Sequence, residues 1–528
     1  MLAKAPIANL FQFGHRWRRA PIIISRRTRC LFAVMVSMKG ILLLSLGLTW
    51  LVHCDLVSAQ SSGATPNENE RRIVRVINGL LPETSLDNQY GPKVSLTNRM
   101  AYYHTPGVTI AVVNNYKIDW ARGFGVKERG KQSPVTEATL FEAGSISKPI
   151  FALGVMRLVQ ERKLDLDKDV NEYLTSWKVP PNGAWQPRVT LRQLLSHSAG
   201  MTVHGFPGYL RSEKLPTVLD ILDGCPPANT VRIEVNIVPG TQVRYSGGGI
   251  TVAQQLVVDV LGQPFPRIMR ELILDPVGMK HSTYEQPLPK RWQGSAATAH
   301  PYKNRPLDGK WHVYPEMAAA GLWTTPSDLA RAGIQLQLAL KGDSNCVLSR
   351  DTATAMLTPG IEEEIGIGFF LSGTGRNVRF GHNGWDEGFV AEMTMYKETG
   401  NGAVIMVNSN EGNPMLYEIE RAIAREYNWA GYFEDERKSV ALSDDTLGRF
   451  VGTYTNKTGL EYSVIQENGH LLFKPPGQPP IEVYPQSGTN FFMKILNAEI
   501  AFDVTKDGHV KALKLQQEGR IFSAERKR

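Results

Sequence analysis

Apolar and polar positions follow two different patterns along this chain of 528 residues. The runs GVTIAVVNN and YKIDWARGFGV have the β-branched, short character of strands and meet at Asn114-Asn115, which is typical of a hairpin. A second pair, FVAEMTMYKE and GAVIMVNSN, surrounds a glycine-rich connection, and the helical pattern PMLYEIERAIAREYNW follows it. Because one strand pair comes early and the other late in this part of the chain, we expect the two pairs to join in one antiparallel sheet of a single domain.

Between the two strand pairs, apolar residues recur at helical spacing. The stretches TLRQLLSHSAGM, ITVAQQLVVDVLG and PSDLARAGIQLQLAL follow this pattern. The predicted fold class is therefore α/β, an antiparallel sheet flanked by helices with an inserted, mainly α-helical region.

The composition changes near residue 433, where FEDERKSVALSDDT is charged and polar. Short alternating runs follow, and the turn dipeptides Asn468-Gly469 and Asp507-Gly508 between them are strong hairpin signals. About eight short strands are expected here, which is typical of a small antiparallel barrel or sandwich. The runs are FVGTYT, EYSVIQ, HLLFKP, NFFMKI, EIAFDV, VKALKL and RIFSAE.

The start of the chain has the three parts of an export signal. A basic segment precedes the apolar run ILLLSLGLTWLV, and the small residues Val57 and Ala59 stand before Gln60. The run is shorter than the ~20 apolar residues of a membrane-spanning helix. We therefore expect cleavage near Gln60 and an extracytoplasmic location, periplasmic or secreted. An uncleaved anchor and a lipid on Cys54 are the alternatives, and Met38 is an alternative initiator.

The predicted organisation has five parts. They are an export signal at 1–59, a linker at 60–74, the α/β domain at 75–432, a second linker at 433–445 and the barrel at 446–528.

Charge and cysteine content exclude some functions. Nearly all of the net charge of +8 lies in the leader, so no nucleic acid or other polyanion is implied as a partner. Cys225 and Cys346 lie far apart without Cys-x-x-Cys spacing or clustered histidines, which gives no support for a zinc site. Whether these two cysteines pair or stay reduced is open at this point.

The first candidate for chemistry is the stretch FEAGSISKPI. Gly144 breaks the backbone and a helical pattern begins around Pro149, so Ser145 is placed near a helix N-terminus. Ser145 and Lys148 would share one face of the first turn, where the helix dipole favours negative charge. This arrangement is suited to acyl transfer. A capping serine beside a solvated lysine is the competing interpretation, and the motif alone does not exclude it.

Two later segments supply further candidates. VPGTQVRYSGGGI places Tyr245 in a glycine-rich turn before a helix, and RFGHNGWDEGF precedes the strand FVAEMTMY. Gly384 would let a substrate lie along that strand, His382 would point into a cleft, and the Trp385 N–H would be an available donor. The alternatives are a half-buried packing role for Tyr245 and a surface position for His382.

Taken together and in this order, GSISK, YSGGG and GHNG, with LLSHSAGM, ILDPVGM and AAAGLWTTPSDLA between them, resemble the serine β-lactamase and penicillin-binding protein family. The nearest branch looks like the class C-like hydrolases, which include D-aminopeptidases, D,D-carboxypeptidases and esterases. The resemblance covers roughly residues 75–430. The terminal strands resemble the lipocalin-like barrel appended to some of these peptidases.

The resemblance implies roles for individual residues. Ser145 would be the acylated nucleophile and Lys148 its base, with Tyr245 relaying the proton, although either Lys148 or Tyr245 could be the true base. The backbone N–H groups of Ser145 and Trp385 would form the oxyanion hole. The residues that would bind substrate are Ser246, Gly247, His382, Asn383 and Gly384. His197 matches a structural signature of the family, and neither a metal nor a cofactor is implied.

Two departures from the family pattern bear on the substrate. Ser246-Gly247 stands where class C β-lactamases have Ala-Asn or Ser-Asn, and His382 replaces the lysine of Lys-Thr-Gly. A histidine with the ordinary pKa of ~6.5 is largely neutral at pH 7 and would gain charge toward pH 6. Both departures disfavour capture of a carboxylate.

The expected function is an exported serine hydrolase that acts through an acyl-enzyme on small amide, peptide or ester substrates. A genuine class C-like β-lactamase is one alternative, and a non-catalytic protein that binds penicillin or peptidoglycan is another. We expect no membrane span after signal cleavage. The natural substrate, the oligomeric state and the role of the terminal barrel stay open.

Overall fold

The structure is a computed structural model. It describes residues 68–80, 85–86, 94–343, 347–432, 436–437, 439–457, 459–467, 469–476, 480–493, 498–517 and 520–527. The predicted export signal, most of the first predicted linker, Cys346 and Asn468 lie outside these residues.

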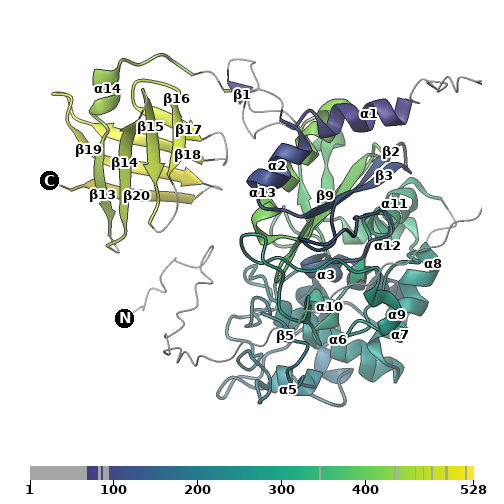
Figure 1. The fold of residues 1–528 in the computed structure, drawn as a ribbon. Coiled ribbons are helices and arrows are strands. Elements are labelled where there is room, and N and C mark those ends of the chain that lie inside the picture. The colour runs from purple at the N-terminus through teal and green to yellow at the C-terminus, as the bar shows by residue number, and fades with distance from the viewer. Residues whose placement is uncertain are drawn as a thin grey trace, which may run out of the picture. The chain divides into compact units, whose positions relative to one another are not determined.

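The centre of the α/β domain is a six-stranded sheet with the order β3-β2-β11-β10-β9-β8 (Figure 1). Each strand pairs antiparallel with its neighbour, and β2 from the early part of the chain pairs with β11 from the late part. The predicted sheet is therefore confirmed. The strands are β2 (Gly107–Asn114), β3 (Lys117–Gly125), β8 (Phe370–Ser372), β9 (Arg379–Asp386), β10 (Phe389–Tyr396) and β11 (Gly402–Val407).

Strand β2 is almost continuously apolar because both faces of the sheet are covered. Ile110 and Val112 belong to the core under helix α13 (Asn413–Glu426), whereas Ala111 and Val113 belong to the core that contains helix α11 (Pro326–Lys341). Successive side chains of a strand point to opposite faces, so one strand contributes to both cores.

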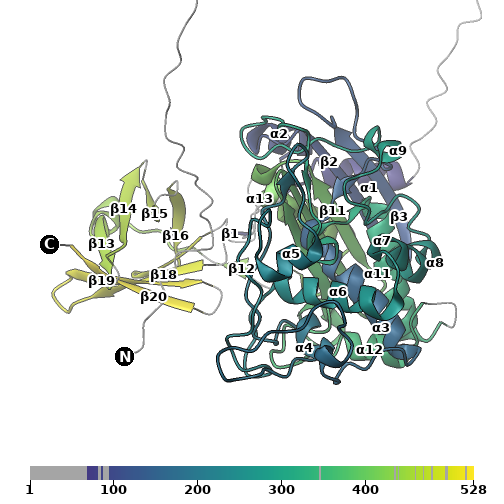
Figure 2. The same cartoon turned by 90° about the horizontal axis from the view of Figure 1, so that it is seen from below.

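Helices α1 (Glu68–Ile77), α2 (Leu96–Tyr102) and α13 lie together on one face of the sheet (Figure 1). The inserted helices lie together on the α11 side (Figure 2). They are α3 (Ser147–Gln160), α4 (Leu191–Leu195), α5 (Val218–Asp223), α6 (Gly247–Leu261), α7 (Phe265–Met269), α8 (Asp275–Val277), α9 (Lys290–Gln293), α10 (Met317–Ala320) and α12 (Arg350–Met356).

Short strand pairs join distant parts of the chain. They are β4 (Phe141–Glu142) with β7 (Trp323–Thr324), β5 (Tyr209–Leu210) with β6 (His312–Val313), and β1 (Ser85–Leu86) with β12 (Glu436–Arg437). Of these strands, β4 leads directly into the turn that contains Ser145.

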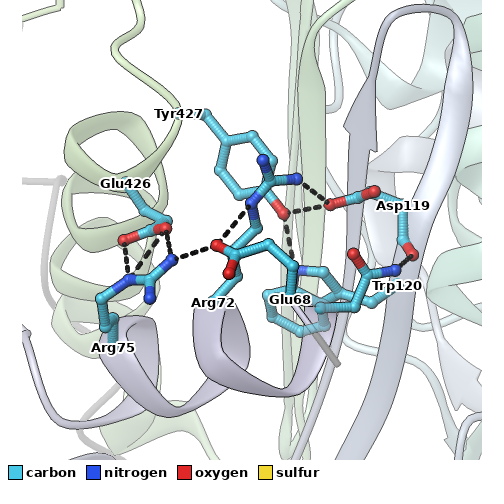
Figure 3. A network of polar contacts seen from close by, with 8 residues as sticks. Glu68, Arg72, Arg75, Asp119, Trp120, Glu426 and Tyr427 are labelled. Atoms are coloured by element: carbon cyan, nitrogen blue, oxygen red, sulfur yellow. Dashed lines mark hydrogen bonds and ion pairs between the residues drawn. The ribbon is translucent and has the colours of Figure 1, made fainter. Parts of the chain in front are cut away.

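Helix α1 corrects the predicted linker at 60–74, since the helix begins at Glu68. Ile73 and Val76 are buried against the core under α13, so α1 is part of the domain. Figure 3 shows the polar contacts around it, in which the Arg75 guanidinium donates to both carboxylate oxygens of Glu426. The polar sequence of this segment reflects one exposed helical face.

The C-terminal strands form a closed eight-stranded antiparallel barrel, in which β13 pairs with β20. Its core is filled by side chains such as Phe473 and Phe491. The sequence runs correctly locate seven strands but miss β16, whose flanking prolines obscure its pattern. The strands are β13 (Gly452–Asn456), β14 (Glu461–Glu467), β15 (His470–Lys474), β16 (Ile481–Pro485), β17 (Asn490–Met493), β18 (Ala498–Val504), β19 (Val510–Gln517) and β20 (Arg520–Arg526), preceded by α14 (Asp444–Gly448).

Among the described residues, no helix has both the length and the apolar character needed to cross a bilayer.

Candidate active site

Ser145 lies in a tight turn that connects β4 to α3. Gly144, Ser145 and Ile146 form one turn of 3-10 helix, and α3 then begins at Ser147. Ile146 holds the cap position of α3 and no side chain caps this helix. The capping interpretation of Ser145 is therefore wrong, whereas its predicted place at a helix start is confirmed.

The Lys148 side chain is buried and points back to Ser145. Its Nζ donates to the Ser145 hydroxyl at 2.8 Å and to the Ala319 carbonyl of α10 at 2.7 Å. Burial lowers the pKa of Lys148 to about 7, and the charge of Asp386 opposes this shift. The interpretation of Lys148 as a solvated lysine is therefore wrong. A large fraction of neutral amine is present at pH 7, and only that form can accept a proton.

Two glycines allow the Ser145 turn to lie against strand β9. A Cβ on Gly144, whose φ is +52°, would overlap the backbone nitrogen of Trp385, and one on Gly384 would overlap the Ala143 carbonyl oxygen. Any other residue at these positions would push the two backbones apart. This close approach places the backbone of Ser145 next to that of Trp385, as a shared oxyanion hole requires.

Tyr245 approaches the same point from the entrance of α6. The Ser246 N–H donates to Nδ1 of His197 at 3.2 Å, and the His197 ring lies 4.2 Å from the Tyr245 ring. The Lys148 Nζ lies 5.0 Å from the centre of the Tyr245 ring. Burial raises the pKa of Tyr245 above its ordinary value, although a hydrogen bond with Ser145 opposes this. The phenol therefore stays protonated at neutral pH.

A cavity of about 380 Å³ opens at Ser145. Its walls are mostly aromatic or amide groups, and no lysine, arginine, aspartate or glutamate is among the described residues that line it. Trp385 keeps 47% of its surface exposed, which is available to a ligand. The lining residues are Ser145, His204, Tyr245, Phe370, Asn383, Gly384, Trp385, Val390 and Asn413.

A sequence model of the family described as Beta-lactamase matches residues 95–427. The chain belongs to the β-lactamase family of serine hydrolases. A second model, a domain of unknown function named DUF3471, matches residues 436–526, which contain the barrel.

The chain is also similar to individual members of the family. It is 24% identical over 444 residues to Penicillin-binding protein 4* of Bacillus subtilis, covering 78% of this chain and 93% of that protein. It is 28% identical over 239 residues to Esterase EstB of Burkholderia gladioli, covering 43% of this chain and 59% of the esterase.

Solved structures show the same fold. The octameric penicillin-binding protein homologue from Pyrococcus abyssi aligns with a TM-score of 0.55 at 19% identity, covering 81% of this chain and 98% of that one. SurE with D-Leu aligns with a TM-score of 0.50 at 22% identity, covering 82% and 97%.

Within this β-lactamase-family site, Ser246 and Gly247 do not line the cavity, which corrects their predicted contact with substrate. The Ser246 hydroxyl caps α6 by accepting from the Gly249 N–H at 2.9 Å, and it donates to the Thr202 carbonyl at 2.7 Å. Gly247 is buried under Phe206. Both residues hold the helix that presents Tyr245.

His382, at the position of the family lysine, is 4% exposed and lies behind the cavity wall. Its Nδ1–H donates to the Asn383 carbonyl at 2.5 Å, and its ring lies 4.8 Å from the Phe370 ring. Burial and the charge of Lys148 lower the pKa of His382 to about 3. The expectation that His382 points into the cleft and gains charge toward pH 6 is therefore wrong. Asn383 and Gly384 do line the cavity.

Sequence reasoning missed several parts of this β-lactamase-family site. His204 and Phe370 line the cavity but belong to no recognisable motif. Glu142 and Asp386 are buried beside the Ser145 turn. Asp386 was detectable in principle, because it follows His382 and Gly384 at the two-residue period of a strand and so shares their face.

Proposed function

We propose that this chain is an exported serine hydrolase that cleaves small, neutral amide, peptide or ester substrates through a covalent acyl-enzyme. The observation that carries the proposal is the 2.8 Å contact between the buried Lys148 Nζ and the Ser145 hydroxyl. A buried lysine with its pKa lowered to about 7 next to a serine is what activation of that serine needs.

In the proposed acylation step, neutral Lys148 accepts the Ser145 proton while Oγ attacks the substrate carbonyl. The negative charge that forms on the carbonyl oxygen is stabilised by the backbone N–H groups of Ser145 and Trp385, each worth ~3 kcal/mol in comparable enzymes. Tyr245 is a protonated phenol and therefore serves as the donor to the leaving group, not as the base. Water then hydrolyses the acyl-enzyme by the reverse sequence of proton transfers.

The cavity favours neutral substrates. A carboxylate gains ~1.5 to 3 kcal/mol from a charge-assisted hydrogen bond, and the described lining residues supply no cation for it. Aromatic groups such as Phe370 and Trp385 instead suit an apolar or flat substituent beside the scissile bond. The similarity to a protein named as an esterase is consistent with this substrate class.

The alternatives make different predictions. A genuine β-lactamase would hydrolyse penicillins. The similarity to a protein named as a penicillin-binding protein is the reason for testing this candidate. A non-catalytic binder has no need of a buried lysine beside a serine, which argues against that reading.

Labelling with a fluorophosphonate probe and a fluorescent penicillin tests the proposal. We expect fluorophosphonate labelling of the wild-type chain to be lost in Ser145→Ala and in Lys148→Ala, because the pair acts as a unit. Ser212→Ala, at an exposed loop serine, is the matched control and should label normally. Turnover on D-amino-acid amides, p-nitrophenyl esters and nitrocefin then separates the substrate classes. Undiminished labelling of Ser145→Ala would overturn the proposed function.

A further inference from the structure

The turn that ends helix α4 places His197 in a backbone conformation that glycine adopts most readily. The Ser198 N–H donates to the Gln193 carbonyl at 2.8 Å, and the His197 N–H donates to the Leu194 carbonyl at 3.3 Å. These two bonds form a Schellman helix end, in which His197 has the left-handed position with a φ of +56°. A residue other than glycine or asparagine costs about 1 to 3 kcal/mol there. The backbone alone therefore gives no reason for a histidine at this position.

His197 instead contacts three consecutive residues at the entrance of α6. Its carbonyl oxygen accepts from the Arg244 N–H at 2.8 Å. Its ring lies 4.2 Å from the Tyr245 ring, at an angle of 36°. Its Nδ1 accepts from the Ser246 N–H at 3.2 Å. These contacts cover the residue before Tyr245, Tyr245 itself and the residue after it. Any residue could provide the carbonyl contact, whereas the other two contacts need the imidazole.

The Ser246 N–H depends on the acceptor that His197 provides. Ser246 is 3% exposed and holds the cap position of α6, so its N–H takes no part in the hydrogen bonds of that helix. A buried N–H without an acceptor costs about 1 to 3 kcal/mol. Burial lowers the pKa of His197 well below its ordinary value, and the charge of Lys148 lowers it further. The ring is therefore neutral at pH 7 and its Nδ1 stays free to accept.

His197 does not line the cavity, and its side chain reaches the candidate active site through Tyr245. It is 5% exposed and lies closer to the Tyr245 ring than any of the three other aromatic rings around it. Those rings belong to His204, His382 and Phe370, at 4.9, 6.1 and 6.2 Å. A change at position 197 therefore alters the placement of the phenol without removing a wall of the cavity.

We propose that His197 is a positioning residue for Tyr245, which it holds where the phenol gives its proton to the leaving group. The inference rests on the proposed function. In this step the Tyr245 O–H bond breaks, and the proton goes to the leaving atom as the bond from that atom to the carbonyl carbon breaks. The phenolate then regains the proton that Ser145 passed to Lys148. His197 itself neither gains nor loses a proton.

The test uses two esters that share one acyl group, a p-nitrophenyl ester and an ethyl ester, and measures kcat/KM for each. p-Nitrophenolate is a weak base that leaves without a proton, whereas ethoxide is a strong base that leaves only as ethanol. His197→Gly removes the ring and the acceptor but suits the left-handed backbone. It should lower kcat/KM for the ethyl ester by about tenfold to a hundredfold, because a misplaced proton donor no longer assists departure. The p-nitrophenyl ester should lose less than about threefold.

His197→Asn is the conservative variant. Asparagine also adopts a positive φ, and its side-chain oxygen can accept from the Ser246 N–H. This variant should recover a part of the ethyl-ester activity that His197→Gly loses. His281→Asn changes an exposed histidine elsewhere in the domain and is the matched control, which should keep both rates. Thermal unfolding checks that each variant folds.

Equal losses for the two esters in folded His197→Gly would overturn the inference, because a merely structural role does not distinguish leaving groups. A wild-type chain that cleaves the p-nitrophenyl ester but not the ethyl ester would also overturn it, since no leaving group would then be protonated. If His197→Gly does not fold, the comparison moves to His197→Asn, in which a wild-type ratio of the two rates would overturn it. Failure of the proposed function is distinguishable, because Ser145→Ala would then cleave both esters as the wild-type chain does.

Discussion

Gly384 touches Ala143 backbone to backbone, so closely that a Cβ at position 384 would overlap the Ala143 carbonyl oxygen. The two residues are far apart in the sequence and belong to β9 and to the segment that follows β4. Their contact brings the turn with Ser145 against the strand with Trp385. The candidate oxyanion hole therefore depends on the absence of a side chain at one position.

Gly384→Ala should reduce acylation by about a hundredfold to a thousandfold, the usual effect of losing an oxyanion donor. The added methyl group would push the Ser145 turn away from β9 and separate the two N–H groups. Burst kinetics with an activated ester measure the effect. Gly294→Ala is the control, because a Cβ there meets nothing and the backbone has an ordinary φ of −68°. A wild-type burst in folded Gly384→Ala would argue against this oxyanion hole.

Acylation should rise with pH between about 6 and 8, with a midpoint near the Lys148 pKa of about 7. Below this pKa the amine is an ammonium and cannot accept the Ser145 proton. The rate of penicillin acylation should not rise as the pH falls toward 6. The pKa of His382 is lowered to about 3, so this side chain gains no positive charge in that range. Rates measured across this range check both statements. A midpoint near the ordinary lysine value would contradict the buried environment of Lys148.

Helix α1 should be held more by its apolar face than by the ion pairs in Figure 3. Ile73→Ala should lower the free energy of unfolding by about 2 to 5 kcal/mol, because Ile73 is buried. Arg75→Gln should cost less than about 1 kcal/mol, since Arg75 is half exposed in its pair with Glu426. Urea unfolding followed by tryptophan fluorescence reports this domain, because residues 446–528 contain no tryptophan. A larger loss in Arg75→Gln would reverse the ranking.

The native chain should begin at or near Gln60, because small residues at positions 57 and 59 fit a signal-peptidase site. Mass spectrometry of protein purified from its own host measures the N-terminus. Retention of residues 38–59 would indicate an anchor, and a lipid on Cys54 would indicate a lipoprotein.

A thiol reagent applied to the same protein should modify Cys225, which is a free and exposed thiol.

Much of the fold was predictable because its signals are local. The strand pairs, the long helices α6, α11 and α13, and most barrel strands each have a hydrophobic period that belongs to one element. The pairing of Ser145 with Lys148 is local as well, since residues three apart share a face of a helical turn. The family motifs identified Tyr245 as a third candidate residue. The glycines that follow it in the sequence also predict the turn on which its role depends.

The sequence by itself therefore determined which residues carry the candidate chemistry, but not the environment that tunes them. His382 has an ordinary side chain, and only burial beside Phe370 and Lys148 makes it neutral. The spacing of Asp386 places it on one strand face with His382 and Gly384, but only the packing of β9 against the Ser145 turn buries it. A local period assigns a residue to a face, whereas its exposure to water and its charged neighbours depend on distant segments packed against that face. Exposure to water and the charges of neighbouring groups together set the pKa of Lys148. Because the groups around its amine come from distant segments, only the tertiary structure decided them.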